Sequence, residues 1–395
     1  MMRVEFSRQA AAVVMCAAIA LCAGLACKQN PSTQKKAMTK PQLQNPPTVQ
    51  WTRTFPGWGT TTYGSCAQQT ADGGYIATGE TVSHDSTPDM AILLVKVDSL
   101  GTTEWQRIIK AARRTVANSV LQTADGGYVV TGMDIVEGNP YCNVCLIKTD
   151  PQGNVLWWRA LNQSVNAEGV SVVEMADRGF TVVARRDAQD SALLLYRTDS
   201  LGNRRWWRQY PVTYLSHDDG PISPISLRQT SDGGFIIGTQ ALLLKTDSLG
   251  YQQWRRSQSD VFSVSSVLQT SDGGYVATGL PLGDTGSYVL KTDGNGNKQW
   301  MRTYASGAQR LAYWLERTAD GGYVIAGRRR PGIACLVRTT QNGTLLWADS
   351  LCRGEARCMR QTPDGGYAVT GYRYDRSIGP EGASRLLLTK LAPEQ

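Results

Sequence analysis

Two histidines, the only ones in this 395-residue chain, stand beside aspartates and could do chemistry. His84 precedes Asp85, and His217 precedes Asp218 and Asp219. Imidazole and carboxylate groups at this spacing can bind a metal ion or transfer protons. Two histidines are too few for a His-rich metal centre, and both segments also suit ordinary solvated loops. We therefore expect no metal and no other cofactor, and we treat these five residues as candidate binding residues.

A second group of candidates combines basic and aromatic side chains. Arg328, Arg329 and Arg330 are consecutive, and Tyr372 and Tyr374 stand two positions apart. A surface of mixed aromatic and charged residues suits a protein or glycan partner. The sequence contains no G-x-S-x-G, H-E-x-x-H or P-loop motif that would indicate a specific catalytic mechanism.

These candidates lie between copies of a repeated phrase. TSDGGYVATG at 270–279 recurs as TADGGYIATG, TADGGYVVTG and TPDGGYAVTG. Each unit continues with an apolar run such as LLLKTD, a turn of the form D-x-x-G-N, and a Trp. The aromatic residue after the glycines recurs every 40 to 55 residues, at Tyr75, Tyr128, Phe180, Phe235, Tyr275, Tyr323 and Tyr367.

The repeated unit predicts four short strands joined by tight turns. Glycine adopts positive φ without steric cost, and an Asp side chain bonds nearby backbone amides. Four strands at this period are typical of one propeller blade. The sequence therefore predicts an all-β fold, a seven-bladed β-propeller of four-stranded antiparallel blades over residues 48–395. Because the Asp of DGG recurs in nearly every unit, we interpret it as structural.

Chain direction places the two kinds of turn on one face of this propeller and the other connections on the opposite face. The opposite face carries the long, unequal segments 81–90, 133–141, 211–224 and 372–384, which include both histidines. Function tends to collect in loops that a rigid frame holds. We expect the long-loop face to bind the partner.

The two ends of the repeat region complement each other. TVQWTRTF at 48–55 resembles a Trp strand with no unit before it, whereas 383–395 matches a third strand with no Trp strand after it. We therefore predict that 49–55 lies antiparallel to 384–391, completes the last blade and closes the ring.

Cysteine positions suggest a bridge at the same place. Cys66 and Cys358 each stand nine residues before the repeat Tyr, in the first and last units. Exported chains favour disulfides, so these two are a candidate pair. A local Cys352–Cys358 bridge, a Cys142–Cys145 redox pair and free thiols remain open alternatives.

The N-terminal segment predicts export. Residues 1–27 have the basic start and the apolar run of a signal peptide. Cys27 after Ala26 resembles a bacterial lipobox, in which the Cys receives lipid; cleavage without lipidation is the alternative. Residues 28–47 have the composition of a flexible tether. We expect a protein anchored by lipid to the bacterial envelope, at the outer membrane or cell surface, or secreted if Cys27 is not lipidated.

The charge distribution argues against nucleic acid as a partner. The formal net charge is +8, but six of the 41 Lys and Arg residues and one of the 33 acidic residues lie in the first 50 positions. The repeat region is therefore almost neutral, unlike an electrostatic footprint for DNA or RNA.

The repeat resembles that of bacterial secreted and lipoprotein β-propellers built from DGGY units, over residues 51–395. DRGF at 177–180 and Thr340, in place of a turn Asp, depart from that pattern. The resemblance implies a fold and an exported location but no single activity. Our first interpretation is a monomeric, non-enzymatic binding or assembly scaffold for an envelope protein or glycan. The alternative is a glycan-active hydrolase or lyase that uses loop-face carboxylates.

Overall fold

The computed structural model describes residues 44–59, 61–83, 89–110, 114–135, 141–162, 166–186, 191–212, 225–282, 286–304, 310–375 and 383–394. Every regular element in these ranges is a β-strand. No helix in the described ranges is long and apolar enough to span a membrane. The predicted signal peptide, tether and Cys27 lie outside the described residues, apart from residues 44–47 of the tether.

Three sheets contain four consecutive strands each, and every strand pairs antiparallel with the one before it. Their strands are β10 (Ala167–Glu174), β11 (Phe180–Arg186), β12 (Ala192–Thr198) and β13 (Arg204–Pro211); β14 (Ser226–Gln229), β15 (Phe235–Thr239), β16 (Leu242–Thr246) and β17 (Gln252–Ser257); and β18 (Val261–Gln269), β19 (Tyr275–Pro281), β20 (Ser287–Thr292) and β21 (Lys298–Tyr304).

A longer sheet joins two such groups. Its first group is β2 (Thr61–Gln69), β3 (Tyr75–Val82), β4 (Met90–Val97) and β5 (Thr103–Ile109), and its second is β6 (Arg114–Gln122), β7 (Tyr128–Ile135), β8 (Asn143–Thr149) and β9 (Val155–Ala160). A single parallel bridge between Met90 and Arg114 connects the groups. Within each group the strands again pair antiparallel in chain order.

Another sheet is continuous because one strand serves two groups. It contains β22 (Arg310–Arg317), β23 (Tyr323–Arg329), β24 (Ile333–Thr339), the 17-residue β25 (Leu345–Gln361), β26 (Tyr367–Asp375) and β27 (Ala383–Leu391). The first half of β25 pairs with β24, and its second half, from Gly354, pairs with β26.

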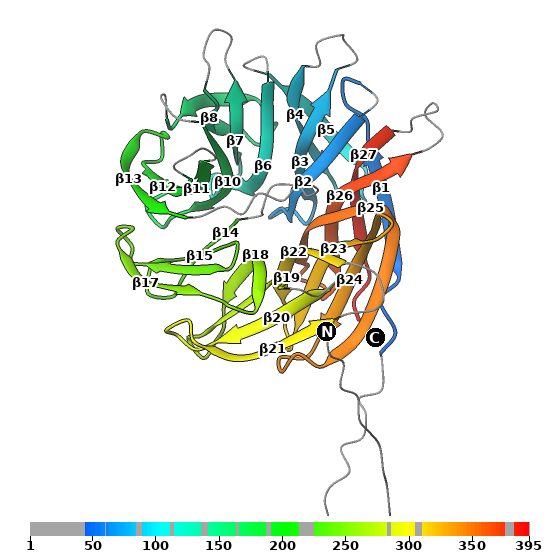
Figure 1. Cartoon of the computed structure of the whole chain (residues 1–395). Helices are drawn as coiled ribbons and strands as arrows, with labels where there is room; N and C mark the ends of the chain where they lie inside the picture. The colour runs from blue at the N-terminus through cyan, green and yellow to red at the C-terminus, as the bar shows by residue number, and fades with distance from the viewer. Residues whose placement is uncertain are drawn as a thin grey trace, which may run out of the picture. The chain divides into compact units, whose positions relative to one another are not determined.

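The first strand of the described chain pairs with the last. β1 (Val49–Phe55) runs antiparallel to β27, with Val49 opposite Leu391 and Phe55 opposite Leu386. The backbone amide of Ala392 also donates to the Thr48 carbonyl at 2.9 Å. Figure 1 shows β1 beside β27.

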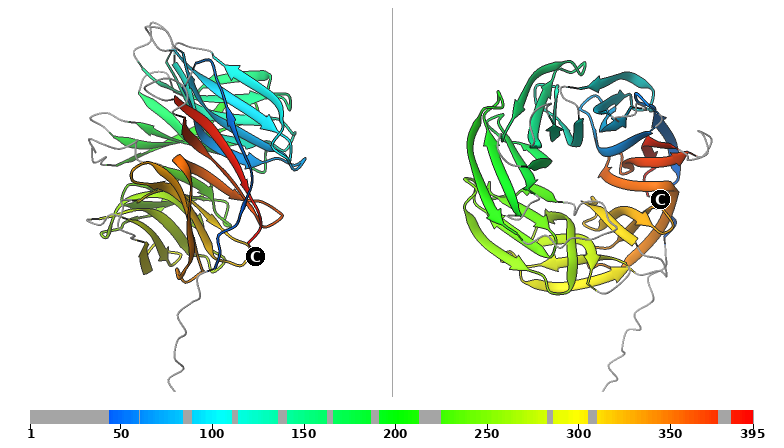
Figure 2. Two further views of the ribbon diagram at one scale, coloured as in Figure 1. Left: turned by 90° about the vertical axis from the view of Figure 1, so that its right-hand side faces the viewer. Right: turned by 45° about the horizontal axis from the view of Figure 1, so that its top comes forward.

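The groups lie around a common centre (Figure 2, right). The first strand of each group contacts the first strands of its neighbours, and β2 contacts both β6 and β25. Third strands such as β4, β8 and β12 are buried along almost their whole length, whereas outer strands such as β9 and β17 are largely exposed. This burial on both faces explains why the third strands have continuous apolar runs.

Each repeated Trp packs on the next group of strands. Trp105 of β5 lies 5.8 Å from the Tyr128 ring, and a Cβ added at Gly153 would lie 2.7 Å from the Trp105 ring. Gly153 has φ of +78°, so the turn and the close ring contact both require glycine there. Arg107 lies 5.5 Å from the same ring. The contact of Trp105 with Arg107 is therefore part of the packing between sheets.

The Asp of each DGG turn is structural, as the sequence predicts. The Asp272 carboxylate accepts hydrogen bonds from Thr270 Oγ1 and the Gly274 amide, and it pairs with Lys291 at 2.8 Å. Lys291 is buried in the third strand of its group. The sequence interpretation missed this cation, although it recurs in the K-T-D phrase. The equivalent pairs are Lys96–Asp72, Lys148–Asp125, Arg197–Asp177, Lys245–Asp232, Arg338–Asp320 and Lys390–Asp364.

The departures from the repeat keep their turns. Arg178 has φ of +63°, in the place of the first glycine of DGG, while Asp177 still accepts from the Gly179 amide at 3.1 Å. Thr340 Oγ1 accepts from the Thr344 amide at 3.1 Å, as an Asp carboxylate does in the other units. A short side-chain acceptor is therefore enough for this turn.

Candidate functional site

The structure describes half of the residues that the sequence proposes for binding. His84, Asp85, His217, Asp218 and Asp219 lie outside the described residues. Arg328 and Arg329 are at the end of β23, Arg330 follows them, and Tyr372 and Tyr374 are on β26. All of these described candidates lie at the ends of strands opposite the DGG turns.

Arg328 and Tyr372 lie in one cluster around the carboxylate of Glu355, a residue that the sequence analysis did not identify. Glu355 is buried and binds Arg328 at 2.7 Å and Arg357 at 3.0 Å. Arg357 lies 4.9 Å from the Tyr372 ring, and the Tyr372 hydroxyl is 3.2 Å from that of Tyr374. Tyr372 is therefore a buried packing residue, whereas Tyr374 is 44% exposed at the edge of the cluster.

A cavity of about 390 Å³ lies at the centre of the sheets. Residues of β2, β3, β4, β6, β7, β10, β11, β14, β18, β22 and β25 line it, so neighbouring groups of strands build its wall together. Its charged lining residues are Glu80, Arg114, Glu168, Arg185, Arg228 and Arg357. Arginine outnumbers glutamate, and we expect the cavity to favour ligands that carry negative or hydrogen-bond-accepting groups.

Two carboxyl groups at the long-loop end of this cavity differ in their surroundings. Glu168 accepts from Asn118 at 2.6 Å and from Arg185 at 2.8 Å. The carboxyl group of Glu80 makes no hydrogen bond or ion pair with the described residues. Burial raises the pKa of Glu80, Arg357 and Arg114 oppose this rise, and the Glu168 charge adds to it.

Towards the DGG turns, two guanidinium groups contact the same indole ring. Arg228 and Arg360 are 4.8 Å and 4.7 Å from the Trp314 ring. Glu316 binds Arg360 at 3.2 Å and accepts from the Trp314 indole at 3.2 Å. Because both cations stack on one ring and share one carboxylate, this end of the cavity is held rigidly.

A pair of thiols lies beside these cations. The Cys358 thiol donates to Cys66 Sγ at 3.5 Å, and both residues are buried. The hydrogen bond from Cys358 lowers the pKa of Cys66 against the opposing effect of burial, and the Arg360 charge lowers it further. Burial raises the pKa of Cys358. The two sulfur atoms are not bonded to each other here, and neither are those of the alternative pairs Cys352–Cys358 and Cys142–Cys145.

We expect Cys66 and Cys358 to form a disulfide when the protein is exposed to oxidised glutathione. The Cys66 thiolate attacks that disulfide, and Cys358 then displaces the reduced glutathione. A bridge between positions so far apart should add about 2–4 kcal/mol to the free energy of unfolding. Peptide mapping without reduction should recover the linked peptides, and Cys66→Ser should remove the added stability. Cys142→Ser is the matched control and should keep it. Alkylation of both thiols in the oxidised protein would contradict the pairing.

The fold has solved counterparts, whereas no protein-family model and no curated protein matches the sequence. The WD40 β-propeller domain of Doa1 is similar with a TM-score of 0.55 and 12% identity, over 86% of this chain and 96% of that domain. A Bacteroides caccae protein of unknown function has a TM-score of 0.47 and 11% identity, over 69% of this chain and 93% of its own. The likeness to the WD40 domain confirms the predicted β-propeller fold and says nothing of function.

Proposed function

We propose that residues 48–395 form a seven-bladed propeller that β1 closes by completing the last blade. The hydrogen-bonded ladder between β1 and β27 supports this. Trp51 gives independent support, because it lies 5.5 Å from the Tyr75 ring and packs on Gly101, as each later Trp packs on the following unit. Arg53 adds a hydrogen bond to the Gly101 carbonyl at 3.1 Å.

This propeller is a non-enzymatic binding or assembly scaffold of the bacterial envelope. Its ligand or protein partner binds the long-loop face and places a polar group in the central cavity. The signal-like N-terminus favours export, and lipid on Cys27 would anchor the propeller through residues 28–47. The mass of the mature N-terminal peptide distinguishes a lipidated Cys27 from simple cleavage after Ala26.

The proposal rests on which charged side chains at the long-loop end of the cavity are paired and which are not. Glu355 is bound by Arg328 and Arg357, and Glu168 by Arg185, so these walls are fixed before a ligand enters. Arg114 and Glu80 make no ion pair with any described residue. A preorganised site that leaves one cation and one carboxyl available loses little entropy when it binds a polar ligand.

Arg114→Ala and Tyr374→Ala are expected to weaken capture of the envelope partner by about tenfold, because Arg114 lines the cavity and Tyr374 is exposed on the long-loop face. Both should leave the melting temperature nearly unchanged. The measurement is titration of immobilised mature protein with envelope extract and a glycan array. His84→Ala and His217→Ala test the two predicted loops in the same assay.

Gln152→Ala is the matched control, since Gln152 is an exposed residue of the turn face. It should leave binding unaltered. If Gln152→Ala weakens capture as much as Arg114→Ala does, the partner binds the turn face and the proposal is wrong.

A glycan-active enzyme remains the second candidate, because Glu80 and Glu168 have different surroundings. A carboxyl with a raised pKa can donate a proton while a second carboxylate, here the one bound by Arg185, acts as base or nucleophile. Incubation with an oligosaccharide panel and mass spectrometry would reveal shortened products. Products that disappear in both Glu80→Gln and Glu168→Gln would establish the enzyme and overturn the scaffold.

A further inference from the structure

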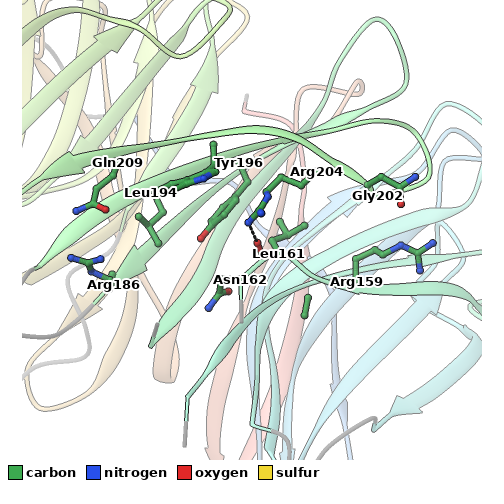
Figure 3. A pocket seen from close by; sticks show the side chains of 12 residues that line it. Arg159, Leu161, Asn162, Arg186, Leu194, Tyr196, Gly202, Arg204 and Gln209 are labelled. Carbon is green, nitrogen blue, oxygen red and sulfur yellow. Dashed lines mark hydrogen bonds between the residues drawn. The ribbon is translucent and has the colours of Figure 1, made fainter. Parts of the chain in front are cut away.

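A second cavity, of about 580 Å³, lies away from the centre between β9 and the last two strands of the next group, β12 and β13 (Figure 3). Twelve residues line it, and none is acidic. The lining instead contains Arg159, Arg186 and Arg204, with the aromatic residues Tyr196 and Trp207. None of the candidate residues from the sequence lies here.

Two of these guanidinium groups are held by neutral partners. Arg204 donates to the Leu161 carbonyl at 2.8 Å, the bond drawn in Figure 3. Arg159 donates to the Trp158 carbonyl at 3.0 Å and lies 5.5 Å from the Trp157 ring. Neither makes an ion pair in the described part of the chain. Arg159 is the repeated Arg that packs on its Trp, as Arg107 does, so the fold sets its position. Its charge and that of Arg204 are oriented but not neutralised, which suits an anionic ligand.

Tyr196 brings a phenol hydroxyl to the same cavity. The residue is 2% exposed, yet its hydroxyl has no hydrogen-bond partner among the described residues. By contrast, the Tyr304 and Tyr288 hydroxyls donate to the carbonyls of Gly343 and Ser263. The Tyr196 hydroxyl faces the cavity without a partner on the described residues, so it can donate to a ligand there. Burial raises the pKa of Tyr196 to about 12, which keeps it protonated.

Comparison with the other repeat units shows that this pair of aromatic residues is a local departure. Tyr196 on β12 lies directly opposite Trp207 on β13. No other unit has an aromatic residue at the Tyr196 position. Their opposite pairs are Val95 and Gln106, Ile147 and Trp158, Leu244 and Arg255, Leu290 and Met301, Val337 and Ala348, and Thr389 and Thr52. A feature needed for the fold would recur in each unit. The Tyr196 and Trp207 pair is therefore not required by the repeat.

We propose that this cavity binds an acidic sugar residue of a glycan. The sugar carboxylate pairs with Arg159 and Arg204, and a sugar hydroxyl accepts from Tyr196. The Trp207 ring is 45% exposed and offers an apolar face to the sugar ring, and the exposed amide of Gln209 lies beside it. An acidic peptide would satisfy the arginines but would not need the exposed indole face. This site is separate from the central cavity.

Titration calorimetry of the full mature protein with trigalacturonate tests the proposal. We expect binding that salt weakens, and Tyr196→Phe, which removes one hydroxyl, should weaken it about fivefold to tenfold. Trp207→Ala should weaken it at least as much. Arg255 is the residue of the next unit that is equivalent to Trp207. Arg255→Ala is therefore the matched control and should bind trigalacturonate like the wild-type protein. Tyr374→Ala should also bind normally, which separates this site from the long-loop face.

Three results would overturn the proposal. The first is no detectable binding of trigalacturonate by the wild-type protein. The second is equal binding by wild type, Tyr196→Phe and Trp207→Ala, since the cavity would then not be the site. The third is equal binding of triglutamate, which has the same number of side-chain carboxylates, because the site would then recognise acidic peptide or charge alone.

Discussion

Deletion of residues 48–55 is expected to lower the free energy of unfolding by about 5 kcal/mol, because a core aromatic and a strand ladder are lost together. Phe55 is buried among Leu386 and Leu388 of β27 and Leu93 of β4. Trp51 would leave the Tyr75 ring and Gly101, and the free edge of β27 would be exposed along its length. Urea unfolding followed by tryptophan fluorescence and circular dichroism measures the loss.

Milder changes keep this prediction testable if the truncated chain does not fold. Trp51→Ala should cost about 2–4 kcal/mol, since the ring is partly exposed and the cavity it leaves can partly relax. Trp58→Ala is the matched control, because Trp58 is largely exposed and should change the midpoint little. A peptide of residues 44–58 should raise the melting temperature of the truncated protein when added in excess. A truncated protein that unfolds like the full chain would contradict the role of β1 in closure.

The repeated part of this fold could be predicted well from the sequence, because every unit contains the residues that determine its turns and strands. Glycines at positive φ, Asp acceptors in the turns and continuous apolar third strands all depend on neighbours close in sequence. The antiparallel four-stranded groups follow from them. The partner of residues 49–55 could also be predicted, because the repeat shows which strand is missing at one end and surplus at the other.

The candidate sites were much harder to predict because they depend on register between strands. Register shifts occur in the innermost strands, for example between Gly64 and Cys66, between Gly169 and Ser171, and between Ala356 and Cys358. Such a shift reverses which side chains point towards the centre, so alternation along the sequence does not identify the cavity lining. The signal for Tyr196 was present in the sequence, as an aromatic residue where no other unit has one, but its meaning depends on Trp207 opposite.

The second large effect concerns the buried cations under the DGG turns. Asp272→Ala is expected to cost about 3–4 kcal/mol, because it leaves the ammonium of Lys291 buried with the Thr292 carbonyl as its remaining partner. The same change removes the acceptor for Thr270 Oγ1 and the Gly274 amide. The double variant Asp272→Ala/Lys291→Met removes the unpaired charge as well and should recover at least half of the loss. Equal urea midpoints for the single and double variants would show that turn capping alone explains the cost.

These pairs also set the expected response to acid. Burial alone would raise the pKa of Asp72 and Asp232, but hydrogen bonds from Lys96 and Lys245, with those from Thr70 and Thr230, lower each to about 2. A folded-state pKa below the ordinary value of 3.8 means that the stabilisation is present above about pH 4. It is lost as the pH falls from 4 towards 2. Urea midpoints between pH 7 and pH 2 should therefore stay level above pH 5 and fall steeply below pH 4. Lys96→Met should reduce that fall, because protonation of Asp72 then breaks no ion pair with Lys96. A wild-type midpoint that does not change with pH down to 2 would refute the role of these pairs.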